Sequence, residues 1–231
     1  MKRLAAILLI LFIAATVSAQ ITHNISTGML NIPANSPNDY IITGSTTSNY
    51  VIVNPPYRGT ITLRDVNIIL SAGIYSPIAI RGINGTSNLT PISNVDIILE
   101  GNNFLVNTGG GRAAFQVDQG TQINISAINP YDNSSGTLAA IQNNSMGGAG
   151  IGSLDYNANR NEANATASLS GIGCLGTTGI TAGGNVIISS GTITAKGGHG
   201  AGIGGGYGTY YDGMIVIYGG IVNASTIRHA A

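Results

Sequence analysis

The stretch that decides the fold is VIISSGTITA at residues 186–195, which aligns without gaps on IVIYGGIVNA at residues 215–224, a 29-residue offset. The same offset relates VNIIL at 66–70 to VDIIL at 95–99, and a 28-residue offset relates VDIIL to INI at 123–125. Self-similarity with a period of about 20 to 50 residues is typical of solenoids and propellers. The chain therefore predicts a repeat architecture and not a mixed globular fold.

Each repeat has the composition of short β-strands, because it is rich in Ile, Val and Thr and is bounded by Gly, Asn and Ser. Alternate residues that point inward would form ladders in layers about 4.8 Å apart. The predicted inward residues are Val66, Ile68, Leu70, Val95, Ile97, Leu99, Val186, Ile188, Ile215 and Ile217. We therefore expect an all-β protein, a single right-handed parallel β-helix. A β-propeller is the alternative, but its blades are about 40 to 50 residues long and usually carry aromatic signatures that this sequence lacks.

The segment 1–19 has the pattern of a secretory signal peptide. Lys2 and Arg3 precede an apolar and small-residue run over residues 4–17, and Val-Ser-Ala at 17–19 provides a cleavage site. This run is too short for a membrane-spanning helix, which needs about 20 apolar residues. We expect cleavage before Gln20, an extracellular or cell-surface location, and no membrane span in the mature chain.

The composition excludes some partners. Of the whole chain 43% is hydrophobic and only 8% is charged, which suits a packed β-rich core and not a disordered chain. Without Lys2 and Arg3, seven positive residues remain against nine negative ones, a net charge of −2. A nucleic-acid partner would require a basic stripe, so none is expected. The single cysteine, Cys174, cannot form an internal disulfide and is expected to be a small buried side chain.

The β-helix is assigned to residues 55–231, with a cap segment before it and a loop inside it. Residues 20–54 are interpreted as an N-terminal segment that covers the first coil, since an exposed strand edge invites unwanted pairing. Residues 154–183 contain few alternating apolar residues and are expected to protrude as a loop. Such loops often carry binding residues in solenoids, although plain surface loops are commoner.

The run NVIISSGTITAKGG at 185–198, followed by GAGIGGG at 200–206, resembles the repeat of bacterial surface proteins described as carbohydrate-binding parallel β-helices of the pectate-lyase-like superfamily. The resemblance covers roughly residues 60–224. It implies a cell-surface or extracellular role, binding to a polysaccharide or a host-surface glycan, and calcium as a candidate ion. Residues 225–231 depart from the repeat, where another Gly-Gly turn is expected. This departure predicts a truncated member that lacks later coils and any C-terminal anchor.

The glycine motif AGIG, at 149–152 and 201–204, suggests one candidate binding site. If Ala201 and Ile203 face inward, Gly202 and Gly204 would leave a strip of bare backbone facing outward. A sugar ring could then stack on a nearby aromatic side chain, and a carboxylate could accept its hydroxyl hydrogen bonds. The candidate ligand-binding residues are Tyr207, Tyr210, Tyr211 and Asp212. The simpler alternative is that the glycines make tight corners and the tyrosines pack within a loop.

Catalytic residues are not assigned. Asp96 and Glu100 lie close together in one predicted strand, and Arg64 and Asp65 precede the equivalent strand one coil earlier. Two carboxylates at a suitable separation can act as acid and base, and lyases of the resembling superfamily use an Arg or Lys base beside acidic calcium ligands. However, Asp96 aligns with Asn67 at the 29-residue offset, so no carboxylate ladder is expected. His199 is interpreted as a turn residue.

Three functions remain open from the sequence. The favoured one is a non-catalytic surface or secreted protein that binds carbohydrate or mediates adhesion. The alternatives are a polysaccharide lyase or hydrolase and a purely structural stalk. Three or more carboxylates converging with an Arg or Lys on one lateral face would favour the enzyme, and an acid-poor face with Tyr would favour binding.

Overall fold

The computed structural model describes residues 18–71, 75–83, 88–143, 147–153, 183–207 and 211–227, and this part of the chain contains β-strands and two short 3-10 helices but no α-helix. The strands are β1 (Gln20–Asn24), β2 (Leu30–Ile32), β3 (Asp39–Thr46), β4 (Val51–Val53), β5 (Arg58–Leu70), β6 (Ile78–Ile80), β7 (Ser93–Asn107), β8 (Phe115–Val117), β9 (Thr121–Ala127), β10 (Gly136–Gln142), β11 (Ile151–Gly152), β12 (Asn185–Ile188), β13 (Thr192–Gly197), β14 (Ile203–Gly204), β15 (Ile215–Ile217) and β16 (Ile221–Thr226). The 3-10 helices are η1 (Ile25–Thr27) and η2 (Asn133–Ser135). All pairings between these strands are parallel.

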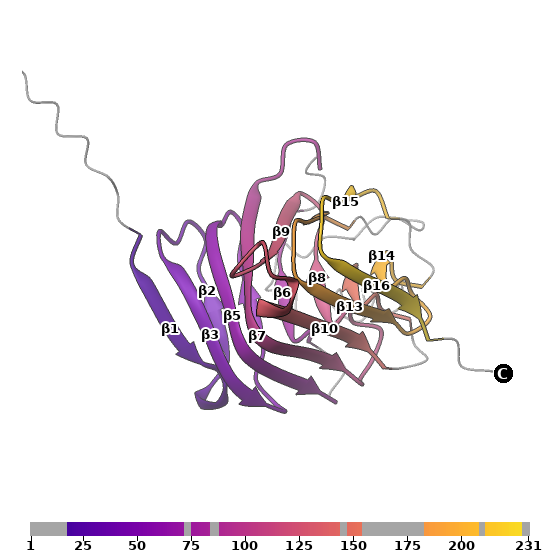
Figure 1. The fold of residues 1–231 in the computed structure, drawn as a ribbon, viewed down its shortest axis with the longest axis horizontal. Helices are drawn as coiled ribbons and strands as arrows, with labels where there is room; N and C mark the ends of the chain where they lie inside the picture. The colour runs from indigo at the N-terminus through magenta and orange to yellow at the C-terminus, as the bar shows by residue number, and fades with distance from the viewer. Residues whose placement is uncertain are drawn as a thin grey trace, which may run out of the picture.

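The strands form three lateral faces. The first face contains β1, β3, the first halves of β5 and β7, and then β9, β12 and β15. The second face contains the later halves of β5 and β7, followed by β10, β13 and β16, and the third is the separate sheet β2-β4-β6-β8-β11-β14. The chain visits the three faces in turn and returns one layer further along, from β1 at the left of Figure 1 to β16 at its right. This confirms the predicted parallel β-helix.

The register confirms most of the predicted repeat. Val186 lies beside Ile215, and Thr192 beside Ile221, both at the 29-residue spacing. The two AGIG motifs also stack, with Ile151 beside Ile203. Val95 lies beside Ile123, which is the 28-residue spacing of the sequence.

The predicted stacking of Val66 on Val95 is wrong. Val95 lies beside Gly59 in β5, whereas VNIIL at 66–70 lies on the second face, with Asn67 beside Phe104. β5 and β7 are long strands that bend around a corner, so segments of similar sequence in them lie on different faces. Every face requires alternating apolar residues. Sequence similarity between two segments therefore does not by itself show that they are neighbours in adjacent layers.

The core runs along the inside of the three faces. In β7 alternate residues are buried, and Val95, Ile97 and Leu99 are fully enclosed. Burial of one such side chain contributes about 1.5–3 kcal/mol. The interior includes Ile42, Val51, Ile61, Leu63, Ile68, Ile78, Ile80, Leu105, Phe115, Ile123, Ile125, Leu138, Ile151, Val186, Ile188 and Ile193. A one-residue slip would turn a whole ladder toward solvent, which fixes the register.

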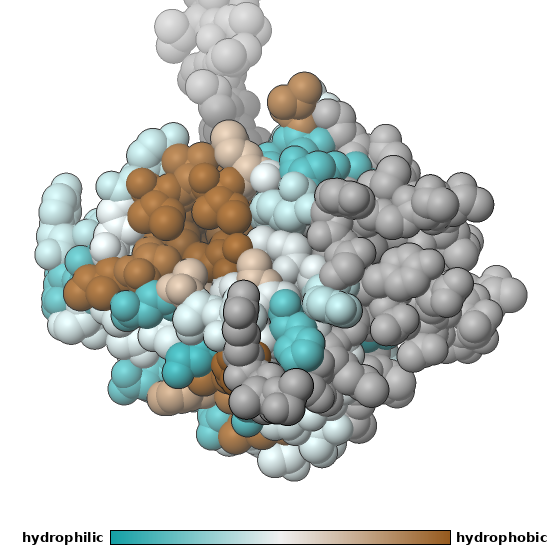
Figure 2. Space-filling view, turned by 90° about the vertical axis from the view of Figure 1, so that its right-hand side faces the viewer, coloured by the Kyte–Doolittle hydropathy of each residue, from teal (hydrophilic) through white to brown (hydrophobic). Residues whose placement is uncertain are grey.

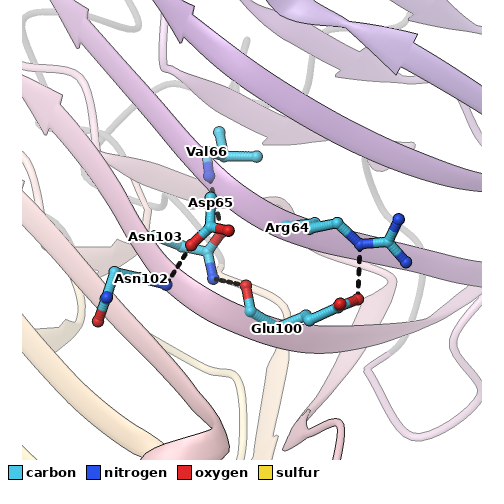
Figure 3. A network of polar contacts seen from close by, with 6 residues as sticks. All are labelled: Arg64, Asp65, Val66, Glu100, Asn102 and Asn103. Atoms are coloured by element: carbon cyan, nitrogen blue, oxygen red, sulfur yellow. Dashed lines mark hydrogen bonds and ion pairs between the residues drawn. The ribbon is translucent and has the colours of Figure 1, made fainter.

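The corner between the first and second faces has its own polar network (Figure 3). Asp65 and Gly101 have positive φ angles, 50° and 67°, where β5 and β7 bend. The Asp65 carboxylate accepts a hydrogen bond from the Asn102 backbone N–H at 2.9 Å. The buried Asn103 accepts one from the Val66 N–H at 3.0 Å and donates to the Thr137 carbonyl at 3.1 Å. Asn103 therefore ties together three successive coils, β5, β7 and β10.

Some of the predictions fall outside the described residues. Tyr210 and Cys174 lie outside the described residues. So do the predicted signal peptide, except Ser18 and Ala19, and the predicted loop at 154–183, except Gly183. Residues 20–54, predicted to cover the first coil, contribute β1 to β4, which stack in register with the later layers. Within the part of the chain that the structure describes, no helix is long and apolar enough to cross a membrane.

Candidate functional site

Of the four residues predicted to bind a ligand, Tyr207 contacts other parts of the chain than Tyr211 and Asp212 do. Its exposed ring stands edge-on to the His199 ring, with the two centroids 5.6 Å apart. Its backbone N–H donates to the Gly147 carbonyl at 2.6 Å. These contacts place Tyr207 beside the loops that follow β10 and β13.

Tyr211 is packed into the protein. Its hydroxyl donates to the Gly184 carbonyl at 2.5 Å, and a Cβ added at Gly183 would overlap the edge of its ring. Burial raises the pKa of Tyr211 above its ordinary range, and the negative charge of Asp212 raises this pKa further. The ring and hydroxyl of Tyr211 thus hold the chain before β12.

Asp212 joins three loops on the same side of the molecule. One carboxylate oxygen accepts a hydrogen bond from the Asn88 amide at 2.9 Å, and the other accepts from the Gln119 amide at 3.2 Å. Asn88 precedes β7, Gln119 precedes β9, and Asp212 precedes β15. Both carboxylate oxygens therefore have partners within the protein, and Asp212 and Tyr211 together link non-adjacent coils.

The expected outward strip of bare glycine backbone is not formed at Gly202. Gly202 is buried, and a Cβ there would lie 2.5 Å from the Ser225 nitrogen and 2.6 Å from the Ala195 carbonyl oxygen. Gly150, one coil earlier, is in the same situation against the Lys196 nitrogen and the Ala140 carbonyl oxygen. The motif requires glycine at these positions because the backbones of the third and second faces approach each other closely there.

A different set of polar side chains gathers on the outer surface of the first face, and we call it the amide ladder: Asn94 and Asp96 of β7, and Gln122 and Asn124 of β9. The Asn124 amide donates to the Asn94 oxygen at 2.9 Å and to the Asp96 carboxylate at 2.8 Å. The Gln122 amide donates to Asn94 at 3.3 Å and to Asn124 at 3.2 Å. The ladder is one hydrogen-bonded unit across two coils.

The strand pattern explains why these four side chains meet. Val95 and Ile97 point into the core, so Asn94 and Asp96 point outward from the same strand. The register places Asn94 beside Gln122 and Asp96 beside Asn124. Asn94 and Asp96 are exposed, while the two β9 side chains are half-buried. The surface thus presents amide and carboxylate groups in fixed orientations to solvent.

The carboxylates considered for catalysis have separate partners. Asp96 accepts from Asn124 in the amide ladder, and its neighbour in β5 is Thr60 rather than the predicted Asn67. The Glu100 carboxylate pairs with the Arg64 guanidinium at 2.7 Å, at the corner shown in Figure 3. Among the described residues, no group of three or more His, Cys, Asp or Glu side chains could hold a metal ion.

The outer surface of the second face carries an apolar stripe that the sequence reasoning missed. Ile69, Val106 and Ile141 lie in register on β5, β7 and β10, and Phe104 lies beside them on β7. Phe104 and Ile69 are exposed. The alternation from Asn103 to Asn107 indicates an outward Phe104, but only if the bend in β7 is known.

The chain matches no protein-family model, and no curated protein and no solved structure matches it. The parallel β-helix is therefore supported by the strand pairing described above.

Proposed function

We propose that this protein is a secreted or cell-surface protein that binds carbohydrate without chemical conversion, with the amide ladder as its binding surface. In this proposal it acts like the bacterial surface parallel β-helix repeat proteins that its repeat resembles, either toward a polysaccharide or toward a host-surface glycan. The observation that supports it most is the fixed set of amide and carboxylate groups formed by Asn94, Asp96, Gln122 and Asn124.

The chemistry of the ladder suits sugar hydroxyls. Each amide offers both an acceptor oxygen and donor N–H groups, and the Asp96 carboxylate is an acceptor. A hydroxyl both donates and accepts, so it can pair with either kind of group. The side chains are already held by one another at 2.8–3.3 Å. Less rotamer freedom is therefore lost on binding, which favours affinity.

The test compares two matched double variants in a glycan-array screen followed by calorimetric titration of the best glycan. Asn94→Ala with Asn124→Ala removes the ladder's central hydrogen bonds. Loss of two or more hydrogen bonds to the sugar, of about 0.5–1.5 kcal/mol each, should weaken binding about fivefold or more. The control is Asn102→Ala with Thr137→Val, a pair joined at 3.1 Å on the neighbouring second face. Unchanged affinity in the ladder variant, or equal loss in both variants, would contradict the proposed site.

The enzyme remains the second candidate because Arg64, Asp65 and Glu100 place a cation and two carboxylates at one corner (Figure 3). An assay for unsaturated products from acidic polysaccharides tests it. Turnover that is lost in Arg64→Ala would establish a lyase in place of the binding protein. If neither binding nor turnover occurs, the structural stalk is the remaining function.

A further inference from the structure

The polar surface of the amide ladder continues onto the preceding coil. Arg58 of β5 lies beside Asn94 in register, and Thr60 lies beside Asp96. The residue between Arg58 and Thr60 lies beside Val95, which is in the core, so these two side chains point outward as the ladder does. Arg58 is exposed and Thr60 is half-buried. Outward polar side chains therefore follow one another over three successive coils, β5, β7 and β9.

These side chains form two rows that run along the axis of the rod. One row contains Arg58, Asn94 and Gln122, and the other contains Thr60, Asp96 and Asn124. Neighbouring coils are about 4.8 Å apart, which is close to the length of one sugar in an extended glycan. A linear glycan that lies along the axis thus meets a new pair of polar side chains with each sugar.

The rows end after β9. In β12 the residue beside Asn124 is Ile187, and Val216 of β15 lies beside Ile187. Asn185, which lies beside Gln122, is buried. Figure 2 views the molecule from the end with β15 and β16 and shows hydrophobic residues gathered there. Sugar hydroxyls therefore find polar partners along three coils of this face and apolar side chains in the next two.

The charges of this surface disfavour an anionic ligand. Thr60 lies between two carboxylates, because its backbone N–H donates to Asp39 at 2.7 Å and its neighbour in β7 is Asp96. The Arg58 guanidinium, which donates to the Pro91 carbonyl at 3.1 Å, supplies one positive charge against these two negative ones. A carboxylate or sulfate on the ligand would meet like charges here.

We propose that the amide ladder, together with Arg58 and Thr60, binds a linear, uncharged glycan that lies along the axis of the rod and occupies three sugar subsites. This inference rests on the proposed carbohydrate binding and adds the direction, the length and the charge of the ligand. Hydroxyl groups donate and accept, so they can pair with the guanidinium, the amides and the carboxylate of Asp96 alike.

The length of the site is tested by calorimetric titration with β-1,4-linked oligosaccharides of glucose and of mannose, from one sugar to six. Affinity should rise up to three sugars and then level off. Arg58→Ala with Thr60→Val should remove the gain from the third sugar, about fivefold for one hydrogen bond of about 1 kcal/mol. The matched control is Lys196→Ala with Thr194→Val, the same spacing of a cation and a threonine on β13 of the second face. It should keep the gain.

The charge of the ligand is tested with the matching glucuronate and mannuronate oligosaccharides. They should bind the unchanged chain about fivefold more weakly than the neutral sugars, as one exposed like-charge contact of about 1 kcal/mol requires. Asp96→Asn keeps an oxygen that can accept from Asn124 but removes the negative charge, so it should narrow the ratio of the two affinities.

The outcomes separate this inference from the proposed function. Glycan binding that is lost with Asn94 and Asn124 but does not depend on the number of sugars would overturn the three subsites alone. So would equal losses in the β5 and β13 double variants. Uronates that bind as tightly as the neutral sugars would overturn the uncharged ligand. If no glycan binds, both the inference and the proposed function are wrong.

Discussion

The two ends of this β-helix are built from the same kind of coil but finish differently. At the N-terminal end, Ile25 in η1 and Ile32 in β2 are fully buried. The Asn24 side chain accepts from the Ser26 N–H at 3.0 Å, and the Asn49 amide donates to the Ile25 carbonyl at 2.9 Å. Half of the Ile217 side chain is exposed at the C-terminal end. We call the N-terminal end the closed end because η1 and its hydrogen bonds bury Ile25, although Ile21 of β1 and Met29 are 39% and 56% exposed there.

The largest expected effect compares Ile25 with Ile217. Ile25→Ala should lower the free energy of unfolding by about 2–5 kcal/mol, because it leaves a cavity in a closed interior. Ile217→Ala should cost about 1 kcal/mol or less, since half of the side chain is in water in the monomer. Urea unfolding at low protein concentration measures both without a contribution from self-association. Similar losses in the two variants would show that the ends are not finished differently.

A smaller effect is expected from the polar groups of the two ends. Asn24→Ala removes the side chain that caps η1 and should cost about 0.5–2 kcal/mol. Asn223→Ala, on the exposed strand β16, should change stability by about 0.5 kcal/mol or less. Thermal unfolding of the two variants side by side measures the difference. A loss at Asn223 as large as that at Asn24 would contradict the assigned role of the cap.

The smallest expected effect is a loss of stability at alkaline pH. It involves two tyrosines in the coils next to the closed end. The rings of Tyr50 and Tyr75 stack with centroids 3.9 Å apart. Burial, aided by the hydrogen bond and charge of Tyr75, raises the pKa of Tyr50 from 10.0 to about 12. The raised pKa means that neutral Tyr50 stabilises the fold fully below pH 10, and that this contribution is lost as the pH rises toward 12.

Tyr50→Phe, which cannot ionise, should reduce this alkaline loss. Unfolding free energies of the unchanged chain and the variant across that pH range measure the difference. Parallel curves would show that Tyr50 has the same pKa in the folded and the unfolded chain, and would contradict the raised pKa.

The sequence predicted the architecture well because the requirement for alternating apolar residues is local. The 29-residue spacing held for β12 to β16, where the coils have equal lengths. It failed for Val66 and Val95, because the bend in β5 and β7 is set by Asp65, Gly101 and Asn103, which carry no periodic signal.

The candidate site was predicted less well. Closeness in the sequence predicts one site made of the tyrosines and Asp212, whereas Asp212 and Tyr211 form hydrogen bonds with residues far away along the chain. The amide ladder could have been found, since the 28-residue spacing of Val95 and Ile123 also places Asn94 beside Gln122 and Asp96 beside Asn124. The apolar stripe at Phe104 required the position of the bend.

The closed end has a consequence for biosynthesis. It contains the first of the described coils, so it leaves the ribosome before the other described layers. Each later coil contacts mainly the one before it, so a nascent chain can fold by laying every new turn on a finished edge. Growth would then run in one direction only, from β1 toward β16.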